Sequence, residues 1–176
     1  MNRIVKIKGT KTRLTGFTLI ELMITVALCA LVVTLTVVNV SFLNRGIVRS
    51  ELNRLYSTCN YLRQCALASG KVQVLDIDFN KGCYSFDGKT EKLNTPVLFG
   101  VVPDVKGPPS SPQSMIRSSV TFKKNQIVFY PDGIISSGTV YLTDRDRTSF
   151  YALSSGIAQV SHLRKYSYNG KWMLLP

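Results

Sequence analysis

Glu21 needs a chemical explanation, because a run of 23 uncharged residues, Leu22 to Asn44, begins directly after it. A carboxylate within a membrane-spanning helix costs about 2.5–3.5 kcal/mol at the bilayer centre and less near an end. Glu21 can lie in the first helical turn, where the helix dipole favours an acid. Alternatively, a cut between Gly16 and Phe17 would create an ammonium group on Phe17, one helical turn from the carboxylate. The sequence leaves both interpretations open.

Residues that could support catalysis or bind a metal are scarce. His162 is the only histidine, and no two of the four cysteines form a Cys-x-x-Cys pair, which largely excludes a zinc site and a thioredoxin-like redox motif. Asp76 and Asp78 alternate as in a calcium loop, but Lys81 stands where that loop needs glycine, so a solvated strand face is favoured. We predict no catalytic residues, no metal and no cofactor, and therefore no enzyme.

Three cysteines follow the apolar run, where disulfides persist if this part lies outside the cytoplasm: Cys59, Cys65 and Cys83. About 9 Å of helix rise separates Cys59 from Cys65, which exceeds the ~7 Å between Cα atoms that a disulfide can span. Cys59 also belongs to an apolar stripe. A disulfide between Cys65 and Cys83 is therefore the preferred pairing, and three separate buried thiols are the alternative.

The C-terminal segment mixes basic with aromatic side chains: Arg164, Lys165, Tyr166, Tyr168, Lys171 and Trp172. Such a mixture can stack on single-stranded nucleic acid and neutralise its phosphates. An ordinary strand with an amphipathic surface fits the pattern equally well. Candidate DNA contacts are therefore Arg164, Lys165, Lys171 and Trp172.

The distribution of charge orients the chain in a membrane. The net charge is +12, and residues 1–16 contain five basic residues and no acid. The positive-inside rule makes 1–16 a cytoplasmic leader and 17–44 the transmembrane half of a helix, although arginines after residue 44 weaken the contrast. A cleaved secretory signal is disfavoured, because its best cleavage site, Ala27 to Ala30, lies inside the apolar run.

The helix is expected to continue through residues 45–70, outside the cytoplasm. Apolar residues recur there at spacings of three and four: Val48, Leu52, Leu55, Cys59, Leu62 and Ala66. Charged residues lie off this stripe, namely Arg49, Glu51, Arg54 and Arg63. Gly70 is a natural stop for the helix.

Residues 71–176 predict a β domain with a Pro-rich excursion at 90–118. Short strands are expected at 72–79, 83–86, 97–102, 120–122, 127–130, 139–142, 149–153 and 157–160. The predicted fold class is α+β, with a long N-terminal helix packed on a small antiparallel sheet or sandwich.

Two segments carry a family resemblance. Residues 11–22, Lys-Thr-Arg-Leu-Thr-Gly-Phe-Thr-Leu-Ile-Glu-Leu, resemble the prepilin-type N-terminal signal. Residues 127–133, Ile-Val-Phe-Tyr-Pro-Asp-Gly, and the glycine-punctuated strands after them resemble the C-terminal domain of GspH/FimT-type minor pilins and pseudopilins. Such proteins are minor structural components of type II secretion pseudopili or type IV pili.

This resemblance implies processing and partners. Prepilin peptidase would cleave between Gly16 and Phe17, Phe17 would be N-methylated, and Glu21 would dock subunits into a filament. The implied partners are other pilins or pseudopilins, prepilin peptidase and inner-membrane lipid. The protein would cross the bacterial inner membrane once, with a cytoplasmic N-terminus and a periplasmic C-terminal domain, before it enters the filament.

A DNA-binding minor pilin that acts in DNA uptake is the alternative function. In DNA-binding relatives, arginines follow the glycine that corresponds to Gly156, whereas this chain has Ile157 and Gln159 at those positions. Binding of nucleic acid would therefore depend on the later basic residues.

Overall fold

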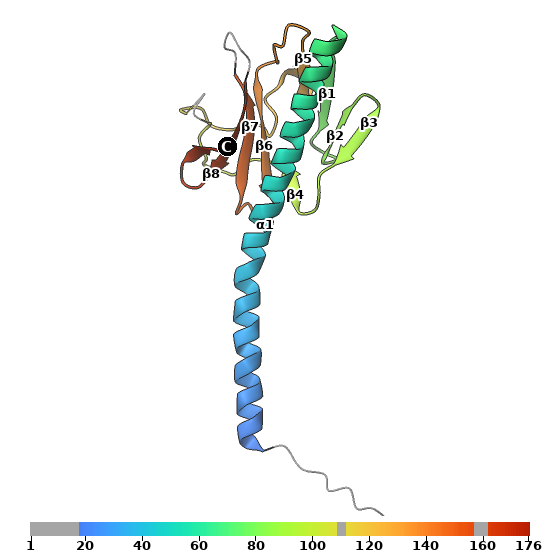
Figure 1. Ribbon diagram of the computed structural model, residues 1–176. Coiled ribbons are helices and arrows are strands. Elements are labelled where there is room, and N and C mark those ends of the chain that lie inside the picture. The colour runs from blue at the N-terminus through green and yellow to red at the C-terminus, as the bar shows by residue number, and fades with distance from the viewer. Residues whose placement is uncertain (1–17, 109–111, 157–161) are drawn as a thin grey trace, which may run out of the picture. The chain divides into compact units, whose positions relative to one another are not determined.

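The computed structural model describes residues 18–108, 112–156 and 162–176, except for the side chains of residues 35–44. Contacts within the chain define two units, Met1–Asn39 and Val40–Pro176. One helix, α1 (Leu19–Ser69), begins in the first unit and ends in the second (Figure 1). The predicted leader and Phe17 lie outside the described residues.

The second half of α1 forms the helical layer of the unit Val40–Pro176. All members of the predicted apolar stripe are buried, with at most 1% of each residue exposed: Val48, Leu52, Leu55, Cys59, Leu62 and Ala66. The helix ends at Ser69, next to the predicted stop. Gly70 has φ +65°, which glycine adopts without strain, and its N–H donates to the carbonyl of Ala66 at 3.0 Å.

Two antiparallel sheets form the rest of this unit. The first has the order β3-β2-β1-β5 and contains β1 (Gln73–Asp78), β2 (Cys83–Phe86), β3 (Lys89–Lys92) and β5 (Gln126–Phe129). The second has the order β4-β6-β7-β8-β9 and contains β4 (Val97–Phe99), β6 (Gly138–Asp144), β7 (Phe150–Ser155), β8 (Leu163–Tyr168) and β9 (Trp172–Leu174). A short 3-10 helix, η1 (Lys123–Asn125), precedes β5.

The observed strands depart from the expected ones between residues 89 and 122. The strand expected at 97–102 ends at Phe99, and the one expected at 120–122 is only an isolated bridge between Val120 and Val140. The strand expected at 157–160 lies outside the described residues. β3, with the sequence Lys-Thr-Glu-Lys, forms although no apolar alternation predicts it.

One core joins α1 to both sheets. Its apolar side chains come from the α1 stripe, from the first sheet and from the second, the sheets contributing among others Leu75, Ile127, Phe129, Val140, Leu142 and Leu153. Within this unit, β1 to β3 lie on one side of α1 and β6 to β8 on the other (Figure 1). The predicted α+β class, a helix packed on antiparallel sheets, is confirmed.

The Pro-rich excursion covers the outer face of the second sheet. Alternation along β7 directs Tyr151 and Leu153 to the core shared with α1, and Phe150 and Ala152 to a second apolar cluster. Val105 of the excursion is buried in that second cluster. Both faces of this sheet are therefore covered, which explains why every residue of β7 is buried.

β6 begins at a position where the core admits only glycine. The ring of Phe122 is buried, and a Cβ added to Gly138 would lie 2.5 Å from the Cγ of that ring. Cβ atoms do not approach other atoms so closely, so any larger residue at Gly138 must displace Phe122.

Candidate functional site

The first turn of α1 is closed by a capping box that Thr18 and Glu21 form. The Oε2 atom of Glu21 accepts hydrogen bonds from the backbone N–H of Thr18 at 3.0 Å and from its hydroxyl at 2.9 Å. The Thr18 hydroxyl oxygen accepts in turn from the backbone N–H of Glu21 at 3.3 Å. These bonds satisfy backbone groups that the start of a helix otherwise leaves unpaired.

This geometry gives the Glu21 carboxylate a local role at the positive end of the helix dipole, as the first interpretation of the sequence expects. Within the described residues, Thr18 is the only hydrogen-bond partner of that carboxylate, and it contacts one of the two oxygens. Gly16 and Phe17 lie outside those residues, so an ammonium group on Phe17 stays a prediction.

The residues after the cap expose apolar side chains within the first unit. Between 53% and 78% of each is exposed: Leu19, Ile20, Leu22, Met23, Ile24, Val26, Leu28, Leu31, Val32 and Val33. The Thr25 hydroxyl donates to the carbonyl of Leu22 at 2.9 Å, and Thr34 makes the equivalent bond, so these polar groups are satisfied by the helix itself. Among the described residues, no helix has both the length and the hydropathy needed to cross a membrane. The predicted span 17–44 includes Phe17 and the side chains of residues 35–44, which lie outside that description.

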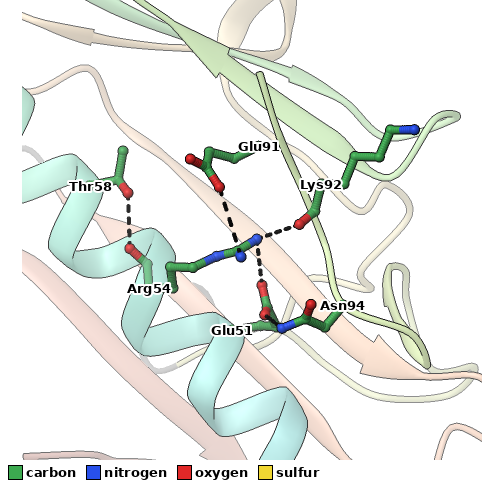
Figure 2. A network of polar contacts seen from close by, with 6 residues as sticks. All are labelled: Glu51, Arg54, Thr58, Glu91, Lys92 and Asn94. Atoms are coloured by element: carbon green, nitrogen blue, oxygen red, sulfur yellow. Dashed lines mark hydrogen bonds and ion pairs between the residues drawn. The ribbon is translucent and has the colours of Figure 1, made fainter. Parts of the chain in front are cut away.

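Glu51 is buried, although its charge predicts a place off the apolar stripe. The residue is only 2% exposed and belongs to a polar network around Arg54 (Figure 2). Asn94 donates from Nδ2 to Oε1 of Glu51 at 2.5 Å, and the Arg54 guanidinium lies 3.0 Å from Oε2. Arg54 also donates to the carbonyl of Lys92 and lies 3.8 Å from the carboxylate of Glu91.

This network attaches α1 to β3 and to the loop that follows it. A buried carboxylate without partners is strongly destabilising, so Arg54 and Asn94 together allow Glu51 to occupy the core side of the helix. The signal for its burial is present in the sequence, because Glu51 lies three residues after Val48 and four before Leu55. Glu51 is not counted in the predicted apolar stripe because it is charged.

Lys165 and Arg164, two candidate DNA contacts, have different environments. The Nζ atom of Lys165 donates to Asn53 Oδ1 of α1 at 3.1 Å and lies 4.8 Å from the centroid of the Tyr56 ring. Arg164 is exposed. Because successive residues of a strand point to opposite faces, the two cations of β8 do not form one binding surface.

The other two candidate DNA contacts, Trp172 and Lys171, also differ in their environments. Trp172 donates from Nε1 to the carbonyl of Lys106 at 2.8 Å, and its ring centroid lies 5.2 Å from that of Phe150. Lys171 is exposed in the turn before β9. The structure therefore uses Lys165 and Trp172 in packing and leaves Arg164 and Lys171 at the surface.

The four cysteines are free thiols, so Cys65 and Cys83 do not form the predicted disulfide. A hydrogen bond with the Cys65 side chain raises the pKa of Tyr61, one helical turn away, while Cys83 is buried at the start of β2. Burial raises the pKa of the Cys59 thiol to about 12. The alternative of three separate buried thiols holds for Cys59 and Cys83, whereas Cys65 is only half-buried.

An α+β protein whose long helix begins in a capping box and packs on antiparallel sheets has the pilin-like fold. Comparison with known families agrees: residues 13–37 match the prokaryotic N-terminal methylation motif, and residues 51–156 match type II transport protein GspH. Because the second match covers more than half of the 176 residues, the chain belongs to the GspH family of type II secretion pseudopilins. No curated protein and no solved structure matches the chain.

Family membership confirms the resemblance seen in the sequence and settles the broad class of function. GspH pseudopilins are structural proteins, so the chain is not an enzyme. The N-terminal methylation motif implies anchoring in the inner membrane.

Proposed function

We propose that the chain is a minor pseudopilin that joins other pseudopilins in a type II secretion pseudopilus. Residues 1–16 form the cytoplasmic leader, 17–44 the membrane half of the helix, 45–70 its periplasmic half and 71–176 the periplasmic β domain. The observation that carries this proposal is the pairing of an N-terminal methylation motif over residues 13–37 with a GspH domain over residues 51–156.

Processing is the first step of the proposed function. Prepilin peptidase cleaves between Gly16 and Phe17, and Phe17 is then N-methylated. Mass spectrometry of the protein extracted from membranes is expected to show a chain that begins at methylated Phe17. An intact leader, or a start after Ala30, in cells with active prepilin peptidase would overturn this step.

Assembly is the second step and involves Glu21. The capping box uses Oε2 of the carboxylate, which leaves Oε1 for the ammonium group of Phe17 in its own or a neighbouring subunit. Such a charge pair is strong in an apolar environment, where water does not compete.

Two matched variants distinguish the role of Glu21 in subunit docking from its role in the helix cap. Glu21→Ala removes both roles, whereas Thr18→Ala removes the cap and keeps the carboxylate. Both variants should be cleaved and inserted into the membrane, but only Glu21→Ala should be largely lost from filaments, as measured by co-purification with the other pseudopilins. Equal incorporation of Glu21→Ala and the unmodified chain would restrict Glu21 to the helix cap.

DNA uptake is the second candidate function, and the exposed cations Arg164 and Lys171 are the observation in its favour. Ile157 and Gln159, where DNA-binding relatives have arginines, lie outside the described residues. We expect only weak binding in a gel shift with the detergent-solubilised chain, lost near ~0.2 M salt as for a purely electrostatic contact. Tight binding at that salt, abolished by Arg164→Ala, would make DNA uptake the preferred function.

A further inference from the structure

A groove of about 450 Å³ lies beside β4, the edge strand of the second sheet. Four segments line it: Phe79 directly after β1, β4 with the residues after it, Arg117 to Ser119 where the excursion ends, and the end of β6 with its turn. Neither the proposed processing site nor the candidate DNA contacts take part in it.

The rim of this groove carries three exposed arginines, Arg117, Arg145 and Arg147. None of them forms a salt bridge within the described part of the chain. Asp144 is the one acid in the lining, and its carboxylate is fully buried, where it accepts bonds from the Thr148 hydroxyl at 2.5 Å and the backbone N–H of Ser149 at 2.9 Å. Asp146 lies between Arg145 and Arg147 in the turn and is exposed, so three exposed guanidinium groups face a single exposed acid there.

The lining of the groove also contains exposed apolar side chains. Phe79 is 43% exposed and Leu98 is 42% exposed, which is high for large apolar side chains beside a sheet. β4 is the edge strand of its sheet, so an extended chain can lie along it and pair with its outer edge. An occupant must therefore combine negative charge, apolar side chains and an extended backbone.

We propose that this groove binds an extended acidic segment of another protein, with its carboxylates on Arg117, Arg145 and Arg147 and an apolar side chain against Phe79 and Leu98. Guanidinium groups suit carboxylates because they can donate two parallel hydrogen bonds. A second copy of this chain is a poor occupant, since its net charge is +12, and it stays positive after removal of the five basic residues of 1–16. Single-stranded nucleic acid is a poor occupant as well, because Phe79 is the only exposed aromatic ring in the lining and stacking needs several.

This inference goes beyond the proposed function, because it adds an interface on the β domain that is independent of cleavage at Gly16 and of Glu21. A chain that fails to enter filaments can still bind through the groove, and a chain with a blocked groove can still be processed. The two proposals therefore fail separately.

Binding is tested on the full chain in detergent, with a short fluorescent peptide that alternates glutamate with leucine. Arg117→Glu/Arg145→Glu should weaken binding by about tenfold or more, since two attractive contacts become repulsive. Arg164→Glu/Lys171→Glu is the matched control, because it changes the charge equally outside the groove, and it should weaken binding less than about threefold through the long-range field alone. Leu98→Ser should weaken binding by about threefold to tenfold, as expected for loss of a partly buried apolar contact.

Three results would overturn the proposal. The first is equal binding of a peptide with glutamine in place of glutamate, and the second is an equal loss in the control double variant. The third is tighter binding of a single-stranded oligonucleotide of the same charge, which would assign the groove to nucleic acid. Unchanged thermal melting of each variant confirms that the β domain is intact.

A photoreactive benzoyl-phenylalanine at position 98 tests the same contact in cells that produce the other pseudopilins. The expected product is a crosslink whose partner peptide, sequenced by mass spectrometry, is acidic. Position 130 is the control, because Tyr130 is 41% exposed and does not line the groove. A crosslink from position 98 only to basic or neutral peptides, or none beyond the level at position 130, would contradict the proposal.

Discussion

Two glutamates of the same helix use their carboxylates in opposite ways. Glu21, in the first unit, bonds to Thr18, three residues away, and closes a helix end. Glu51, in the second unit, pairs with Arg54 and with Asn94, which lies 43 residues further along the chain. The first contact needs only one helical turn, whereas the second exists only when the β domain has folded.

The apolar side chains of α1 show the same contrast. Those from Leu19 to Val33 are exposed within their unit, whereas the stripe from Val48 to Ala66 is buried by the two sheets. An apolar surface that the chain does not cover is suited to lipid or to neighbouring subunits. The β domain therefore holds the second half of the helix in place, whereas the first half depends on what surrounds the protein.

The largest effect should come from Leu52→Ala, which leaves a cavity in the core of the second unit. We expect a loss of about 3–5 kcal/mol in the free energy of unfolding. Denaturation followed by the fluorescence of Trp172, the only tryptophan, reports on this unit. Leu31→Ala, on the exposed part of α1, is the control and should change that free energy by less than about 0.5 kcal/mol. Similar losses for the two variants would remove the contrast between the halves of the helix.

The next effect concerns the buried network. Glu51→Ala removes the buried carboxylate that Arg54 and Asn94 share, and we expect a loss of about 2–4 kcal/mol in the same denaturation measurement. Glu91→Ala removes only the more exposed partner at 3.8 Å and should cost less than about 1 kcal/mol. A loss for Glu51→Ala no greater than that for Glu91→Ala would show that the network does not hold β3 to α1.

High pH should weaken the second unit specifically. Burial raises the pKa of Cys59 from 9.0 to about 12, so the thiol ionises in the unfolded chain before it can ionise in the folded one. Stability is therefore complete below pH 9 and falls as the pH rises toward 12, by about 2 kcal/mol for this group midway through that range. Tyr141, whose pKa burial raises to about 12, adds to the same fall.

Cys59→Ala isolates the contribution of the thiol. The variant starts from a lower stability because it leaves a small cavity, but its free energy of unfolding should decline less steeply between pH 9 and 11 than that of the unmodified chain. Equal slopes would show that Cys59 is accessible to water and hydroxide in the folded protein.

The smallest effect belongs to the capping box. Thr18→Ala should destabilise the first turn of α1 by about 1 kcal/mol, the usual cost of losing an N-cap. Hydrogen exchange in detergent should show faster exchange of the amides in that turn, with no change in the denaturation of the second unit. Slower exchange at Glu21 in the variant would contradict the cap.

Periodicity explains how much of this fold the sequence predicts. The stripe from Val48 to Ala66 repeats at helical spacing, and Gly70 follows the last residue of the helix. The buried face of α1 and its C-terminal end can therefore both be predicted from the sequence. Strands with apolar alternation, such as β5, can be predicted in the same way, because apolar side chains recur at every second residue. These features depend on residues a few positions apart.

Features that depend on residues far apart in the chain cannot be predicted from local sequence patterns. β3 is polar throughout, and it forms because β2 pairs with it in register from Phe86 to Cys83. Glu51 looks like a surface residue until Asn94 and Arg54 surround it. The same holds for the sites. A capping box can be predicted from the three-residue spacing of Thr18 and Glu21, whereas the groove beside β4 is assembled from four separate segments of the chain.

The close approach of Phe122 to Gly138 restricts how this sequence can change over time. Because the ring occupies the space of a missing Cβ, alanine at position 138 becomes acceptable only after the ring at position 122 has been made smaller. Each change alone lowers stability, while the pair together should recover part of the loss. The two positions are therefore epistatic, and a substitution at one of them has an effect that depends on the residue at the other.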